Sequence, residues 1–219
     1  YTASVGSCDV TTNNGGFDFW VVKLNSLGNL QWQKCLGGTG FDVANSVSLT
    51  SDGGYIVAGS TESNDNDVTG NHGDRDCWVV KLNSLGVIQW KKTYGGTLKD
   101  YAHSIIQTSD SGYVLAGGSR SNNGDVTGNH GTDDVWIVKI NATGTIQWQK
   151  ALGGTDRDNA NSMKQTIDGG YLIGGTAKST NGNITGNHGN FDCWIVKISS
   201  TGALQWQKSL GGSNDDQAF

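Results

Sequence analysis

Three histidines stand in identical tripeptides of the sequence, and histidine is the commonest metal ligand in proteins. His72, His130 and His188 each lie within Asn-His-Gly, and the copies are 58 residues apart. Because the copies fall in successive repeat units, the histidines can share one ion only if their loops converge on a common axis. The interpretation that we favour is a turn in which Asn or His adopts a left-handed conformation beside glycine.

Acidic side chains flank the first of these histidines. Asp65, Asp67 and Asp74 lie within a short segment, and carboxylate oxygens are ligands that calcium prefers. These three residues are therefore candidate calcium ligands, and calcium is the one cofactor that the sequence suggests. The equivalent segments, Ser121–Asp125 and Ser179–Asn183, contain fewer carboxylates. We therefore expect a hydrogen-bonded polar loop without a cofactor as the general structure.

The sequence contains no residue pattern typical of an active site. Ser-His-Asp, zinc-ligand and phosphate-loop arrangements do not occur, and the carboxylates recur at the same positions in every unit. A structural role predicts such recurrence, whereas a catalytic pair shares one pocket with differently tuned environments. His103 is the only histidine outside the repeated loops, and it stands where other units have Asn45 and Asn161. We expect His103 to be a hydrogen-bonded residue at a seam or channel, and we expect no enzymatic activity.

A repeat of 58 residues organises the chain. The eight tryptophans fall in two series at that spacing, Trp20, Trp78, Trp136, Trp194 and Trp32, Trp90, Trp148, Trp206. Each unit contains four strand-like runs separated by turns with glycine. Units of about this length, with four short strands each, are typical of propeller blades. We therefore predict an all-β fold, a β-propeller of four-stranded antiparallel blades, with about four blades in this chain.

Composition agrees with this fold and excludes two classes of partner. The 219 residues include 34 glycines and no proline, which suits short strands joined by many turns. The formal net charge is -5, and the 15 Lys and Arg are spread through the units, so a nucleic-acid groove is excluded. No apolar run approaches the roughly 18 residues of a membrane helix, so we expect no membrane insertion.

Alternation along the strands shows why a unit needs neighbours. Trp20 and Val22 face one side of their strand, while Phe19 and Val21 face the other. Because both faces are apolar, each sheet must be covered on both sides, and we predict that most of the tryptophans are core residues. We predict a single domain over residues 1–219, a segment of a longer array, with units at 1–43 (partial), 44–101, 102–159 and 160–217.

The unit resembles the repeat of bacterial seven-bladed β-propeller proteins, especially the tandem-repeat surface proteins that gliding bacteria secrete by the type IX route. The resemblance rests on Asp42-Val-Ala-Asn-Ser46, Ser51-Asp-Gly-Gly-Tyr-Ile-Val-Ala-Gly59, Asp76-Cys-Trp-Val-Val-Lys-Leu-Asn83 and Ile146-Gln-Trp-Gln-Lys-Ala-Leu-Gly-Gly154. It implies a propeller fold and a secreted or cell-surface location. The chain departs from the best-known form of the family because the loop before the third strand lacks proline.

Strand order places two sets of connections at one end of the blades. The loop from the second to the third strand, at 62–75 in the first complete unit, emerges at the same end as the connections between units. We call this end the loop-rich face, and we predict that it binds ligand because loops on a rigid scaffold carry most binding sites. The predicted ligand-binding residues are Asp42, Asp67, Asn71, His72, Asp100, Asp125, Asn129, His130, Asp158, Asn187 and His188.

Three functions fit these features. The first, which we predict, is a non-catalytic secreted or cell-surface module for recognition or adhesion, with a protein or carbohydrate ligand at the loop-rich face. The second is a structural spacer or an assembly component of a larger surface complex. The third is an enzyme whose site uses non-repeated residues such as Lys99, His103 and Arg157.

Overall fold

The computed structural model describes residues 13–218, which form fourteen β-strands in three four-stranded antiparallel sheets and one two-stranded sheet. The strands are β1 (Phe19–Leu24), β2 (Leu30–Leu36), β3 (Asp42–Leu49), β4 (Tyr55–Thr61), β5 (Asp76–Leu82), β6 (Ile88–Tyr94), β7 (Asp100–Gln107), β8 (Tyr113–Ser119), β9 (Asp134–Ile140), β10 (Ile146–Leu152), β11 (Asp158–Gln165), β12 (Tyr171–Ala177), β13 (Asp192–Ile198) and β14 (Leu204–Leu210). Within these residues, no helix is long and apolar enough to cross a membrane. The predicted all-β fold of four-stranded blades is confirmed.

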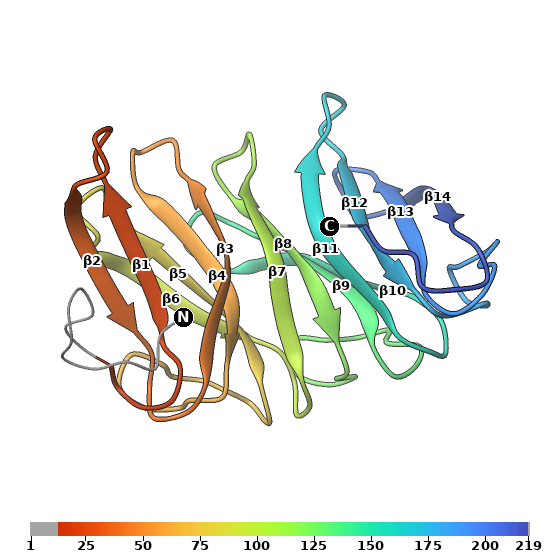
Figure 1. Ribbon diagram of the computed structural model, residues 1–219, viewed down its shortest axis with the longest axis horizontal. Helices are drawn as coiled ribbons and strands as arrows, with labels where there is room; N and C mark the ends of the chain where they lie inside the picture. The colour runs from red at the N-terminus through yellow and green to blue at the C-terminus, as the bar shows by residue number, and fades with distance from the viewer. Residues whose placement is uncertain (1–12, 219) are drawn as a thin grey trace.

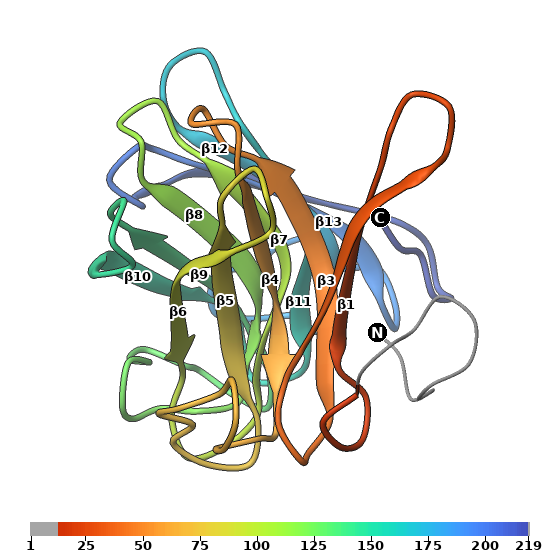
Figure 2. The same cartoon turned by 90° about the vertical axis from the view of Figure 1, so that its left-hand side faces the viewer.

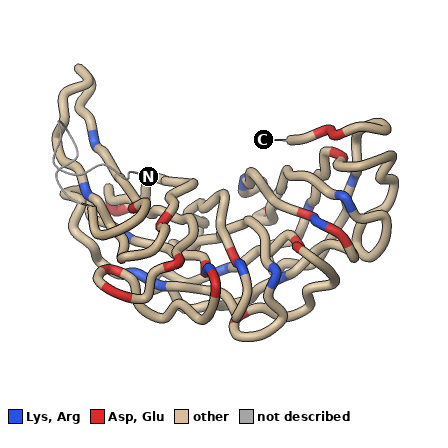
Figure 3. Tube along the Cα trace, turned by 60° about the horizontal axis from the view of Figure 1, so that its bottom comes forward, with Lys and Arg blue, Asp and Glu red and all other residues tan. Residues whose placement is uncertain are grey.

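The sheets lie side by side in chain order and form an arc (Figures 1 and 3). Each complete sheet pairs only neighbouring strands, in the orders β3-β4-β5-β6, β7-β8-β9-β10 and β11-β12-β13-β14. The first strand of each blade begins at Asp42, Asp100 or Asp158, two residues before the predicted unit boundary. The described part of the first unit contributes the sheet β1-β2, and the remainder of that unit, residues 1–12, lies outside the described residues.

Long loops and tight hairpin turns project from opposite ends of the sheets (Figure 2). The loops at 62–75, 120–133 and 178–191 belong to the loop-rich face. The turns at 50–54, 83–87, 108–112 and 141–145 lie at the other end, which we call the hairpin face. The two faces therefore carry different chemistry on one scaffold.

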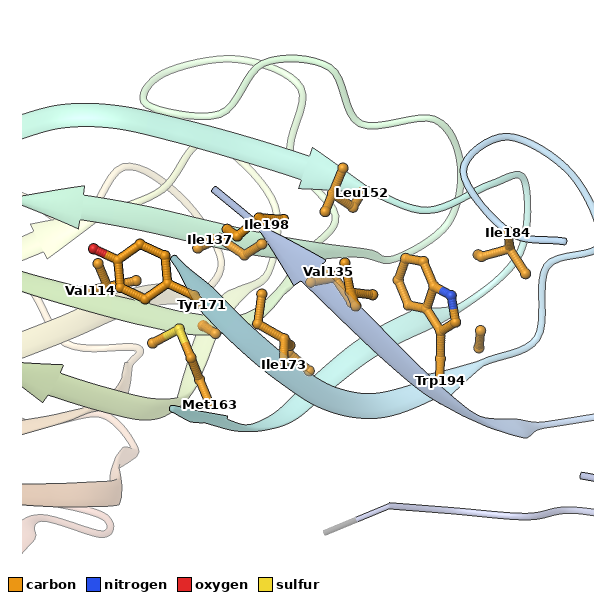
Figure 4. Close-up of a cluster of buried hydrophobic side chains, with 14 residues drawn as sticks. Val114, Val135, Ile137, Leu152, Met163, Tyr171, Ile173, Ile184, Trp194 and Ile198 are labelled. Carbon is orange, nitrogen blue, oxygen red and sulfur yellow. The ribbon is translucent and has the colours of Figure 1, made fainter. Parts of the chain in front are cut away.

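Three hydrophobic clusters fill the spaces between successive sheets. In the last of them, Val135 and Ile137 of β9 pack with Ile173 of β12 and Trp194 of β13 (Figure 4). Trp78, Trp136 and Trp194 of the first tryptophan series are at most 1% exposed. These three are core residues as predicted, and each packs toward the sheet that precedes it.

A β-bulge in each first strand links one blade to the next. The pairing of β3 with β4 skips Asn45, and the Asn45 Nδ2 group donates a 2.9 Å hydrogen bond to the Ala102 carbonyl of the next blade. The pairing of β7 with β8 skips His103 in the same way, and Nδ1 of His103 donates to the Ala160 carbonyl at 3.1 Å. The bulge thus turns a polar side chain toward the neighbouring sheet, and His103 is the hydrogen-bonded seam residue that was expected.

We expect His103→Asn to retain this bond and to change the free energy of unfolding by less than about 0.5 kcal/mol, whereas His103→Ala should cost about 1 kcal/mol. Burial lowers the pKa of His103. The wild type should therefore lose stability as the pH falls from about 6.5 through the lowered pKa of the folded state, and His103→Asn should remove that loss. Urea unfolding followed by circular dichroism on either side of this pH measures both effects. Equal stabilities of the Asn and Ala variants at neutral pH would show that the bond contributes nothing.

Candidate functional site

Each repeated loop on the loop-rich face holds a histidine against a buried aspartate. Nδ1 of His72 lies 2.6 Å from Oδ2 of Asp76, and the His72 backbone N–H donates to the same oxygen at 2.9 Å. Asp76 is fully buried, while the His72 side chain is 46% exposed. The pairs His130–Asp134 and His188–Asp192 repeat this geometry at 2.6 and 2.9 Å. The carboxylate orients each ring, and Nε2 has no partner within the described residues.

The turn that carries each histidine differs from the predicted one. The left-handed residues are Gly70, Gly128 and Gly186, with φ of 83°, 83° and 76°, so the prediction of a left-handed Asn or His is wrong. Glycine takes this conformation without a Cβ clash. Asn71 instead ties the loop together, because Nδ2 donates to the carbonyls of Thr61 (3.4 Å) and Ser63 (3.2 Å). Nδ2 of Asn129 and of Asn187 donates to the equivalent pairs of carbonyls.

Asp42, Asp100 and Asp158 lie beneath the loop-rich face and are fully buried. Oδ2 of Asp100 accepts hydrogen bonds from the Gly96 backbone N–H and the Ser121 hydroxyl, both at 2.7 Å. Burial raises the pKa of all three carboxyls, and the hydrogen bonds oppose that rise. These aspartates therefore join the turn between blades to the long loop, and they shape the face from below.

The candidate calcium ligands face separate partners. Asp65 accepts hydrogen bonds from the Thr39 backbone N–H and hydroxyl, both at 2.8 Å. Asp67 lies 3.7 Å from Nζ of Lys91, and Asp74 lies 3.6 Å from Nζ of Lys99. Oδ2 of Asp125, like Oδ2 of Asp67, accepts from a glycine N–H of the preceding turn between blades. In residues 13–218, no group of three or more His, Cys, Asp and Glu side chains is placed to hold a metal ion.

Non-repeated residues at the edges of the long loops pair with one another. Glu62 forms an ion pair with Arg75 in the first loop. In the second loop the charges are reversed, since Arg120 lies 3.1 Å from Asp133. In the third loop, Nζ of Lys178 lies 5.8 Å from the centre of the Phe191 ring. Two residues that the enzyme alternative would use, Lys99 and Arg157, are also paired. Nζ of Lys99 lies 3.6 Å from Asp74, and Nε of Arg157 lies 3.8 Å from Asp133.

The hairpin face contains the second tryptophan series, for which the strand alternation predicted mostly core positions. Trp32, Trp90 and Trp148 are only half-buried, and Trp206 is 49% exposed. The first three lie against Tyr55, Tyr113 and Tyr171, with ring centres 5.5, 5.9 and 6.1 Å apart. The core prediction for this series is therefore wrong in part. A signal was present in the sequence, because Gln and Lys flank these tryptophans whereas mostly apolar residues flank the first series.

No known protein-family model matches the chain. The sequence is 26% identical over 187 residues to the regulatory protein FlaEY of Caulobacter vibrioides, a similarity that covers 78% of this chain and 19% of FlaEY. The chain thus spans about a fifth of the length of that curated protein. A crystal structure of a protein of unknown function from Bacteroides caccae aligns with a TM-score of 0.35 and 13% identity, over 90% of this chain and 78% of that one. The proposals below therefore rest on the geometry of this chain.

The reversed order of charges in the first two loops allows a direct test of the energetic coupling between Glu62 and Arg75. Glu62→Arg alone places two guanidinium groups together and should lower the free energy of unfolding by about 1 kcal/mol. Adding Arg75→Asp creates the arrangement found at Arg120 and Asp133, and it should restore most of that loss. Both partners are partly exposed, so the coupling should shrink at high salt. Urea unfolding of the wild type, both single variants and the double variant measures it. Additive effects would contradict the coupling.

Proposed function

We propose that this chain is a non-catalytic recognition or adhesion module of the β-propeller type, secreted or displayed at the cell surface, with its ligand on the loop-rich face. The observation that carries the proposal is the threefold repetition of one loop geometry. His72, His130 and His188 are each oriented by a buried aspartate and left half-exposed. Three blades therefore present the same group in the same orientation.

The loops that present these histidines are held rigidly. One aliphatic side chain anchors each loop in the core and is at most 1% exposed, namely Val68, Val126 or Ile184. A preorganised loop loses little conformational entropy on binding. Thr69 lines the same surface hollow as His72 and is exposed, as are the equivalent Thr127 and Thr185. An evenly spaced array of this kind suits an extended or repetitive ligand, a protein or a carbohydrate, because linked weak contacts raise the overall affinity.

Binding to panels of immobilised glycans and extracellular-matrix proteins tests the proposal. We expect a wild-type ligand from which each single variant, His72→Ala, His130→Ala or His188→Ala, dissociates faster. The triple variant should lose binding by at least about tenfold through lost multivalency. His103→Asn is the matched control, since it changes a histidine at a blade seam. Unchanged binding by the triple variant would refute the site, and turnover that depends on one non-repeated residue would favour an enzyme.

A further inference from the structure

A cavity of about 350 Å³ lies on the hairpin face, between the first two complete blades, β3–β6 and β7–β10. Its walls come from both sheets. It is lined by Asp52, Lys81, Gln89 and Trp90 from one sheet and by Gln107 and Tyr113 from the other. The volume lies at the lower end of the range for small-molecule sites, about 300–1,000 Å³.

The charges in this cavity cancel. Nζ of Lys81 lies 2.9 Å from Oδ2 of Asp52, and it also donates to Oε1 of Gln89 at 2.8 Å and to the Leu82 carbonyl at 3.0 Å. Hydrogen bonds from Thr50 and Lys81 lower the pKa of Asp52, so the carboxyl is ionised at neutral pH and balances the ammonium. An ionic ligand would therefore find no unpaired opposite charge among these residues.

Neutral hydrogen-bonding groups are left unpaired. Tyr113 is 2% exposed, yet its hydroxyl makes no hydrogen bond to any described residue. Oε1 of Gln107 accepts from the Ser51 backbone N–H at 2.7 Å, and Oε1 of Gln89 is bound by Lys81. The Nε2 groups of both glutamines have no partner in the described part of the chain. The cavity thus offers amide donors and a hydroxyl, with no net charge.

An ordered aromatic wall completes the cavity. Trp90 is half-buried, and its Nε1 donates a 3.0 Å hydrogen bond to the Ala142 carbonyl of the next sheet. The Tyr113 ring meets the indole edge-on, with centres 5.9 Å apart. These contacts hold the indole in place, so a ligand that packs on it does not have to order it.

We propose that this cavity is a binding site for a neutral sugar ring. A pyranose has an apolar face that packs on an indole and equatorial hydroxyls that match amide and phenol groups. The site lies on the opposite end of the sheets from the histidine loops, so it stands independently of the function proposed above. The next interface keeps the same framework, with Lys139 at 2.9 Å from Asp110 and Trp148 beside Tyr171.

Indole N–H signals in proton–nitrogen correlation spectra test the proposal. The probes are glucose, galactose, mannose, N-acetylglucosamine and their disaccharides, titrated into the low millimolar range and above, with glucuronate as the charged counterpart. We expect at least one neutral probe to shift the Trp90 signal saturably, and glucuronate to bind more weakly. Tyr113→Phe removes only the unpaired hydroxyl and should raise the Kd at Trp90 about five- to tenfold, by the usual contribution of one hydrogen bond.

The matched control is Tyr101→Phe, which removes a tyrosine hydroxyl at the loop-rich end of β7. It should leave the Trp90 titration unchanged, and the spectrum of each variant shows that it remains folded. The Trp148 signal should respond equally in the wild type and in Tyr113→Phe. The proposal is overturned if no neutral probe shifts Trp90, if glucuronate binds as well as its neutral counterpart, or if Tyr113→Phe leaves the Kd unchanged. None of these outcomes bears on the histidine loops.

Discussion

The structure depends on one constraint, that each complete sheet is apolar on both faces and must be covered by neighbouring sheets. Ile56 of β4 and Val79 of β5 face the following blade, whereas Val57 and Val80 face the preceding one, and all four are at most 1% exposed. The bulged first strand also passes close to the second strand of the same sheet. A Cβ on Gly59 would lie 1.9 Å from the Val43 carbonyl oxygen, so only glycine fits where the bulged first strand crosses the second. Each blade therefore needs both the burial of its apolar faces and a glycine opposite the bulge.

Stacking in turn decides how polar groups are placed at the two ends of the blades. Buried charges must be paired or hydrogen-bonded. At the hairpin face, Lys81 satisfies this requirement with Asp52 and a backbone carbonyl. At the loop-rich face, Oδ2 of Asp76 satisfies it with the His72 ring and backbone N–H. The same requirement therefore shapes both faces. At the loop-rich face, pairing a buried carboxylate orients a histidine. At the hairpin face, pairing a buried ammonium leaves a neutral cavity lined with glutamine and tyrosine.

Much of the fold could be predicted from the sequence, because the repeat defines the length of one unit and the order of its strands. Alternation in β1 and the spacing of Trp78, Trp136 and Trp194 predicted blades with two apolar faces, as observed. The candidate site was less predictable. Asp100 was expected at the surface and lies beneath it, where Ser119 and Ser121, distant in sequence, donate to its carboxylate. The left-handed residue is Gly70 and not His72, because the aspartate four residues later sets the histidine conformation. Local patterns cannot show which distant groups come within hydrogen-bonding distance.

The sequence by itself determined the repeat, the strands, the two apolar faces of each sheet and the end from which the long loops project. These properties depend on local periodicity and turn chemistry, which neighbouring residues determine. Only the tertiary structure decided that Trp90 lies beside Tyr113 of the next sheet and that the Tyr113 hydroxyl is unpaired. Trp78 and Trp90 have the same strand propensity, but Trp78 lies on the inner strand β5 and Trp90 on the edge strand β6 of the same sheet. Contacts across a seam are properties of two blades together, so one blade's sequence does not contain them.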